Sequence, residues 1–312
     1  MPSMLTAVPP TVAIEIAKKR VCVVAIGRAA GSPVVDGFAA EPLPENAVVP
    51  SLQGVNIADR QVVAAALSQA LERAGLRSTT RAALIVPDSV ARVSLLPFEQ
   101  VPARSAELDK LVRWQMRKAT PFSLDDAQVS HFVASKTLTG VNVAAVVARR
   151  DVIAQYEGVA DALGIHAGLV DLASFNVMNA VVASGSVAAG DWLLVHLASE
   201  ATTLAIMRGS ELMFYRHRPA VDEEPLSALV HQTAMYHEDR LGGGQFARVW
   251  LSGAAQGLER ARQEIGGRLG VPVESVDIRP AASLRDAVAV SADLLDSLAA
   301  PVGVLLREQK AA

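Results

Sequence analysis

The chain starts with short apolar segments, rich in β-branched residues, that are separated by polar or glycine-containing turns. Such segments lie at residues 12–16, 21–26 and 33–40 and predict three consecutive strands. Residues 57–74 then carry apolar side chains at the three- and four-residue spacing of an amphipathic helix, which Gly75 ends. Further apolar segments at 82–86 and 91–96 predict two more strands.

The same pattern returns in the second part of the chain. Residues 192–197, 202–207 and 211–216 predict three strands joined by short polar turns. Alternating helices and strands follow, with helices predicted at 226–241, 256–269 and 291–306 and a strand at 247–251. The two copies share almost no sequence identity, so only the pattern repeats. We therefore expect two α/β halves.

Residues 92–165, between these halves, follow a plan of their own. A strand is followed by a helix at 105–118, for which Ser105 is the expected N-cap, then by strands at 128–135 and 141–148 and a helix at 151–163. This strand-helix-strand-strand-helix order predicts an inserted module.

Composition narrows the function classes. Half of the residues are hydrophobic and the net charge is −3, which is typical of a globular protein and argues against general nucleic-acid binding. The single cysteine, Cys22, fits a reducing compartment. The first ten residues lack the pattern of a signal peptide, and the apolar runs are too short to span a bilayer. We expect a cytoplasmic protein with no direct membrane insertion.

The histidines do not predict a metal site. His217, His231 and His237 lack acids or cysteines at the spacing of metal ligands, so no metal is expected. His196 lies on a predicted strand, where a hydrogen-bonded structural role is favoured over a ligand role. Lys18-Lys19-Arg20 could grip phosphate, but three basic residues in a hairpin turn are more commonly solvated.

An ordered series of motifs resembles a known family. The series comprises Leu96-Pro97, Glu107-Leu108, Val112-Arg113-Trp114-Gln115, residues 118–126 (KATPFSLDD), residues 143–152 and Trp250-Leu251-Ser252-Gly253. In this order the segments look like the type IV pilus assembly protein PilM. The two halves that each open with a β-turn-β unit are also similar to actin-like ATPases.

The resemblance implies an α/β, actin-like fold of two lobes, of the FtsA and PilM type. Residues 1–91, 166–189 and 285–312 would form the first lobe, and residues 190–284 the second. Residues 92–165 would form an inserted, SHS2-like βαββα module. The upper subdomain of the second lobe would be reduced, because residues 219–225 lead directly to a single helix.

The same resemblance points to a degenerate nucleotide site. The family carries Asp-Ile-Gly in two phosphate-facing turns, where this chain has Glu15-Ile16-Ala17, followed by Lys18, and His196-Leu197-Ala198. A Gly-Gly pair near the nucleoside has become Gly253-Ala254. Phosphate turns need glycine for close backbone approach and an acid to handle Mg²⁺. We therefore expect no catalysis and no cofactor, with ATP binding as the alternative.

Function would then depend on recognition. The family implies binding of the short N-terminal cytoplasmic tail of a PilN-like inner-membrane protein near the inserted module. An apolar groove for such a peptide could be formed by Val93, Leu95, Leu96, Leu111 and Trp114. The alternative for Trp114 is a place in the core of the module.

The sequence thus predicts a non-catalytic adaptor of a type IV pilus-like machine, recruited to the inner face of the bacterial inner membrane, where it contacts other machine components. Two alternatives are an actin-like ATPase of the same machine and the cytoplasmic component of a type II secretion system, of the GspL kind. The latter normally continues into a transmembrane helix, whereas this sequence ends at Ala312. Homo-oligomerisation, as a ring or a filament, stays open.

Overall fold

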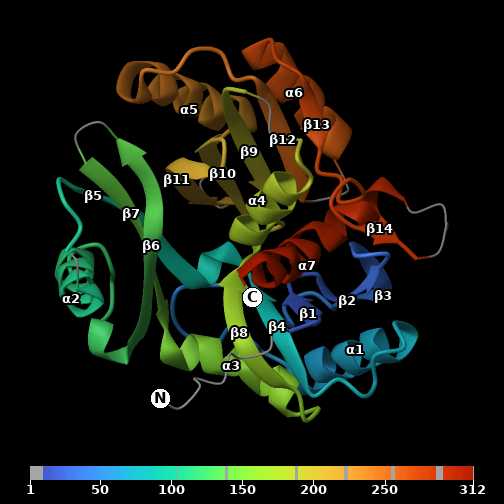
Figure 1. The fold of residues 1–312 in the computed structure, drawn as a ribbon. Helices are drawn as coiled ribbons and strands as arrows, with labels where there is room; N and C mark the ends of the chain where they lie inside the picture. The colour runs from blue at the N-terminus through green and yellow to red at the C-terminus, as the bar shows by residue number, and fades with distance from the viewer. Residues whose placement is uncertain are drawn as a thin grey trace.

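A computed structural model describes residues 10–102, 104–137, 140–186, 189–220, 224–253, 257–285 and 291–311. Two lobes, each built on a mixed sheet, lie beside a smaller three-stranded sheet (Figure 1). The predicted two-lobed α/β arrangement with an additional module is confirmed.

The sheet of the first lobe has the order β14-β3-β2-β1-β4-β8. Its strands are β1 (Val12–Ile16), β2 (Arg20–Ala29), β3 (Ser32–Pro42), β4 (Arg81–Val86), β8 (His166–Leu172) and β14 (Ser283–Leu284). The first three strands are antiparallel, whereas β4 and β8 run parallel to β1. Every residue of β1 is buried, because helices cover both faces of the sheet.

The sheet of the second lobe repeats this topology with the order β11-β10-β9-β12-β13. Its strands are β9 (Asp191–Leu197), β10 (Ala201–Arg208), β11 (Glu211–Pro219), β12 (Arg248–Gly253) and β13 (Val273–Ser275). Helices α5 (Leu226–Leu241) and α6 (Leu258–Leu269) cover its outer face. Within the described residues, α5 is the one helix between β11 and β12, so the upper part of this lobe is reduced.

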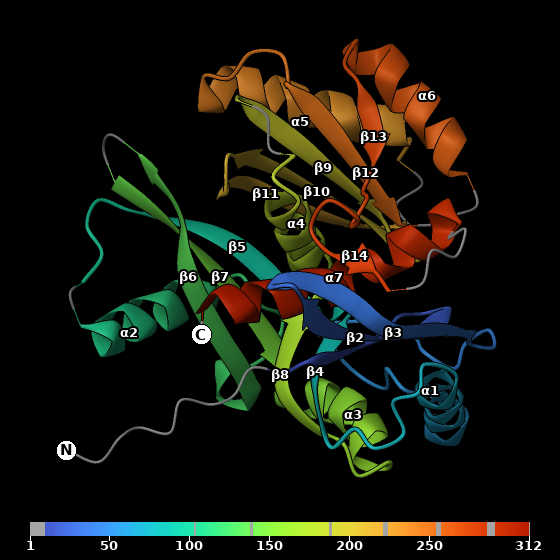
Figure 2. The same cartoon turned by 45° about the vertical axis from the view of Figure 1, so that its right-hand side comes forward.

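Two helices lie between the lobes: α4 (Ala173–Ala183) and α7 (Ala292–Ala311) (Figure 2). They pack closely, because a Cβ on Gly303 of α7 would collide with the backbone carbonyl of Asn176 in α4. One apolar core extends from the first sheet through these helices to Trp192 and Trp250 of the second. The lobes are therefore joined by a continuous core.

The smaller sheet has the order β5-β7-β6 and carries helix α2 on one face. Its elements are β5 (Ala91–Phe98), α2 (Ser105–Met116), a short 3₁₀ turn η2 (Leu124–Asp126), β6 (Ala127–Thr137) and β7 (Gly140–Arg149). Leu108, Val112 and Met116 of α2 are buried against the sheet. Helix α2 starts at Ser105, and its N-cap residue Arg104 makes no side-chain capping bond, so the predicted cap at Ser105 is wrong.

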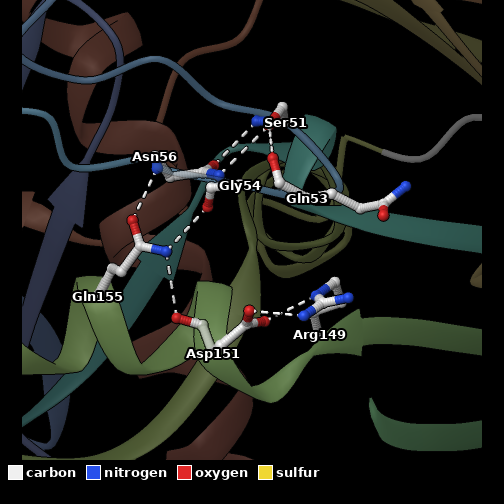
Figure 3. Close-up of polar contacts among 7 residues, drawn as sticks. All are labelled: Ser51, Gln53, Gly54, Asn56, Arg149, Asp151 and Gln155. Carbon is white, nitrogen blue, oxygen red and sulfur yellow. Dashed lines mark hydrogen bonds and ion pairs between the residues drawn. The ribbon is translucent and has the colours of Figure 1, made fainter. Parts of the chain in front are cut away.

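Helix α3 (Arg150–Asp161), which the sequence assigns to the module, also packs against the first lobe, where it meets β8 and α1 (Arg60–Arg73). Figure 3 shows the polar part of this contact. The Gln155 side chain accepts hydrogen bonds from the backbone N–H groups of Asn56 (2.6 Å) and Ile57 (3.1 Å) and donates one to Gly54 (3.0 Å). The short strand β14, at the end of the span predicted for the second lobe, pairs with β3 of the first.

Candidate functional site

Small-ligand sites are commonly clefts of about 300 to 1,000 Å³. A cleft of about 480 Å³ lies between the lobes. It is lined by the turn after β1, the turn after β9, the end of β4 and the end of β12. The structure therefore brings together six residues named from the sequence: Glu15, Ala17, Lys18, His196, Ala198 and Gly253. Ala254 lies outside the described residues.

The first turn is closed by its own hydrogen bonds. The Glu15 side chain is buried and forms an ion pair with Arg20, with Nη2 to Oε2 at 3.2 Å. This carboxylate also raises the pKa of the Arg20 guanidinium. The backbone N–H of Ala17 donates to the Arg20 carbonyl at 2.9 Å, and Ala17 does not adopt a positive φ. The turn is thus a tight hairpin with Lys18 and Lys19 at its tip.

In the second turn a buried histidine, His196, stands at the position where the family resemblance implies an acid. His196 is 9% exposed, and its Nδ1 lies 3.3 Å from the Ser252 hydroxyl. Gly253 keeps a φ of +98°, and a Cβ there would collide with the Leu197 carbonyl of the neighbouring strand. The close approach of β12 to β9 therefore requires this glycine, whatever the ligand.

Asp296 of α7 lies beneath this second turn. Both carboxylate oxygens accept from the Gly253 N–H at 2.9 Å. Burial raises the pKa of Asp296, and it also raises the pKa of Glu200 at the cleft wall. Neither acid was predicted as a site residue from the sequence. Asp296 lies more than 40 positions from Gly253, the residue that it contacts, so no local pattern links the two.

Asp88, which follows β4, joins the two lobes. Its Oδ1 accepts from the Ser174 N–H of α4 at 3.1 Å, and its Oδ2 accepts from the Thr203 hydroxyl of β10 at 2.8 Å. Thr203 Oγ1 is 3.0 Å from Nδ1 of His217, whose Nε2 is 3.1 Å from Ser89 Oγ. The sequence predicted only a turn at residues 87–89. Only the pairing of β10 with β11, which sets Thr203 opposite His217, reveals the network.

Two of the histidines named from the sequence, His217 and His237, make defined polar contacts. Burial lowers the pKa of His217, which favours the neutral form of this ring. His237 does have an acidic partner, contrary to the expectation from spacing, because its Nε2 lies 2.6 Å from Asp191. Among the residues that the structure describes, no three His, Cys, Asp or Glu side chains are arranged to hold a metal ion.

The residues predicted for a partner groove do not share one surface. Val93 and Leu95 pack against the main core, whereas Leu96 packs into the core of the module on the opposite face of the small sheet. Leu111 and Trp114 lie on the outer side of α2, where their exposed fractions are 41% and 65%. Side chains alternate along a strand, so neighbouring apolar residues of β5 cannot line the same groove. Trp114 is also not a core residue.

An apolar cavity does lie at the other side of the small sheet, with a volume of about 550 Å³. It is bordered by β6, β8, α4 and the β10–β11 hairpin. Phe132 is 45% exposed there and meets Phe175 edge to face, with ring centroids 5.7 Å apart. Phe175 in turn lies 5.4 Å from Tyr215. An ion pair between Asp171 and Arg307 adds charge to an otherwise mainly apolar lining.

Two sheet edges border this cavity. Strand β6 is the last strand of the small sheet, and β8 is the last strand of the first-lobe sheet. Residues 132–134 of β6 and 169–172 of β8 line the cavity consecutively, so backbone as well as side chains faces it. In the described part of the chain, β6 pairs with β7 and β8 pairs with β4, each on one side. An edge strand offers unpaired N–H and C=O groups to an extended peptide.

Comparison with known proteins gives a family match. A family model described as type IV pilus assembly protein PilM matches residues 13–238. No curated protein sequence matches this chain. No helix in the described ranges combines the length and apolar character needed to cross a membrane.

Solved structures show the same fold at low sequence identity. A PilM–PilN type IV pilus biogenesis complex contains a chain that is 15% identical, with a TM-score of 0.80, over 96% of this chain and 98% of that one. A Bacteroides thetaiotaomicron protein with an actin-like ATPase fold is 9% identical with a TM-score of 0.53, over 90% and 95%. The cytoplasmic domain of EpsL, from the type II secretion system of Vibrio cholerae, is 9% identical with a TM-score of 0.50, over 96% and 94%. The actin-like fold is thereby confirmed.

Proposed function

Because the chain belongs to the type IV pilus assembly protein PilM family, we propose that it is a non-catalytic adaptor of a type IV pilus-like machine. Its apolar cavity would take the extended cytoplasmic tail of a PilN-like inner-membrane protein. That partner would hold the chain at the inner face of the inner membrane. The observation that carries the proposal is the apolar cavity bordered by β6 and β8, each of which pairs with a strand on one side only within the described residues.

The polar contacts of the interlobe cleft support the absence of catalysis. Mg²⁺ is held in nucleotide sites by carboxylates and phosphate oxygens. Glu15, Asp88 and Glu200 are the carboxylates that line this cleft, and each accepts a hydrogen bond from a protein group. Asp296, beneath the second turn, accepts from the Gly253 N–H. The Ala17 N–H, which could face a phosphate, is bonded to Arg20. These contacts support the proposal that the cleft does not hold a magnesium-bound nucleotide.

The cavity suits an extended, mainly apolar peptide. Alternate side chains of such a peptide would contact Phe132 and Phe175, while its backbone would pair with the β6 or β8 edge. The fold matches a chain solved in a complex with PilN, which supports a PilN-like tail as the occupant. The likeness to EpsL keeps a related secretion machine as the alternative setting.

The absence of catalysis is tested by titrating the full chain with Mg-ATP in a calorimeter. We expect no heat of binding at micromolar concentrations and no phosphate release above a protein-free blank. Binding at micromolar concentrations would overturn the adaptor-only proposal in favour of the nucleotide-dependent alternative.

The partner is tested with a fluorescent peptide that carries the N-terminal cytoplasmic tail of a PilN-like inner-membrane protein. Phe132→Ala should weaken binding about tenfold, because it removes an aromatic contact of roughly 1 to 2 kcal/mol from the cavity wall. Trp114→Ala is the matched control, since it removes an exposed aromatic on the other side of the module and should leave binding unchanged. A peptide methylated at alternate backbone nitrogens should bind poorly if strand pairing contributes. No binding of the unmodified peptide, or equal loss in both variants, would contradict the assignment.

A further inference from the structure

Helix α2 exposes an unusual combination of side chains on the face turned away from the small sheet. We name this surface the α2 outer face; it consists of Lys110, Leu111, Trp114, Arg117 and Lys118, all exposed. Trp114 lies three or four positions from each of the other four residues, so the five share one side of the helix and of the turn that follows it. Helix α2 lies at the outer edge of the molecule in both views (Figures 1 and 2).

The charge of this face is positive. The two acids of the helix are already engaged: Asp109 bonds Arg113 at 2.8 Å, and Glu107 lies 3.6 Å from Arg104. Lys110, Arg117 and Lys118 form no ion pair with any residue of the described ranges. Three basic groups are thus available to an anionic partner.

We propose that the α2 outer face rests on an anionic lipid surface. Indole rings favour the bilayer interface, where one edge is apolar and the other hydrated, and Trp114 is the one tryptophan that points into solvent, since Trp192 and Trp250 are buried. Lysine and arginine stems lie along the interface while their charges reach the lipid phosphates. Helix α2 would lie along the lipid surface, because its apolar residues Leu108, Val112 and Met116 stay buried against the small sheet and only its outer face meets the lipid.

A lipid surface fits this face better than a polypeptide does. Neither the interlobe cleft nor the apolar cavity includes a residue of α2, so Trp114 projects from the surface and does not line a pocket. The apolar cavity lies on the opposite side of the small sheet, which leaves it open to a peptide while α2 contacts lipid. The proposal stands independently of the peptide-binding role.

The test is flotation of the full chain with vesicles of phosphatidylcholine alone or of phosphatidylcholine with phosphatidylglycerol. We expect binding to the anionic vesicles only, with loss in about 1 M salt, where the screening length falls to about 3 Å. Trp114 is also an internal probe, because acrylamide reaches it far more readily than the two buried tryptophans. Its quenching should decrease when anionic vesicles are added.

Two variants and a control locate the surface. Lys110→Gln/Arg117→Gln should lower partitioning about 25-fold, at about fivefold for each base, and Trp114→Ala at least about tenfold. Arg260→Gln/Arg268→Gln removes the same charge from exposed positions of α6 and should leave partitioning within about twofold of the unmodified chain. Because all these side chains are exposed, the variants should keep the unmodified melting temperature.

Three results would overturn the proposal. The first is equal binding to both kinds of vesicle, and the second is equal loss in the α2 and α6 variants. The third is binding to polyglutamate that depends on Trp114 without any binding to vesicles, which would identify an acidic polypeptide as the partner.

Discussion

Replacing Asp88 with alanine tests whether the acid at the centre of the cleft is structural. Asp88 is 5% exposed and accepts two hydrogen bonds, from the Ser174 N–H at the start of α4 and from the Thr203 hydroxyl of β10. A hydrogen bond to a charged group contributes about 1.5 to 3 kcal/mol net, and the variant also leaves the Ser174 N–H unpaired. Since removing the buried charge offsets part of this loss, we expect the free energy of unfolding to fall by about 3 kcal/mol.

The assay is urea unfolding at pH 7.5, followed by circular dichroism, with the slope compared between variants. Asp88→Asn keeps one acceptor oxygen in the same shape and should cost about 1 kcal/mol. Thr203→Val should cost about 2 kcal/mol, and the double variant with Asp88→Ala about 1 kcal/mol less than the sum, because the two side chains share a bond. A cost below about 1 kcal/mol for Asp88→Ala, or strict additivity, would refute the structural role and restore Asp88 as a candidate ligand for Mg²⁺.

Three other features can be tested directly. Gly303→Leu should destabilise the chain by roughly 2 kcal/mol or more in the same urea assay, because the side chain would collide with the Asn176 carbonyl; a neutral result would contradict the close packing of α4 and α7. Burial raises the pKa of the Cys22 thiol to about 12, so a disulfide reagent should modify it only in denaturant, and rapid native labelling would contradict its burial. Hydrogen bonds from Arg208, with a further one from His237, lower the pKa of Asp191, so its contribution is complete above the unfolded pKa of about 3.9 and is lost as the pH falls through the lower folded value. Asp191→Asn should therefore flatten the stability profile below about pH 4, and an unchanged profile would refute the pairing.

The pattern of apolar positions determined most of the secondary structure. Burial on both faces makes β1, apart from Glu15, and β4, after Arg81, apolar throughout, and amphipathic spacing marks α1 and α5. These elements therefore lie close to where the sequence predicted them. Helix α1 starts three residues later than predicted from residue 57, because the Asp59 side chain caps it by accepting from the Val62 N–H at 3.0 Å. The repeated β-turn-β pattern likewise anticipated two lobes, and the structure shows that their sheets share a strand order.

Local sequence also identified the turns that meet at the cleft, because each directly follows a strand of one half. Glu15 and His196, which are far apart in the chain, do line one cavity. The hydrogen bonds that the acidic side chains accept in and beneath the cleft come from residues far away in the chain. Asp88 is bonded to Thr203 and Asp296 to Gly253, and no local pattern encodes such contacts.

The recognition surfaces were decided by tertiary structure alone. The predicted groove joined residues that are close in sequence, but alternation along β5 sends them to opposite faces, and α2 turns Trp114 outward. The cavity that does form takes its walls from β6, β8, α4 and β10, which meet only when the module packs against the two lobes. Local periodicity determines which face of an element is apolar, whereas the neighbour that covers that face, or leaves it open, depends on how the whole chain packs.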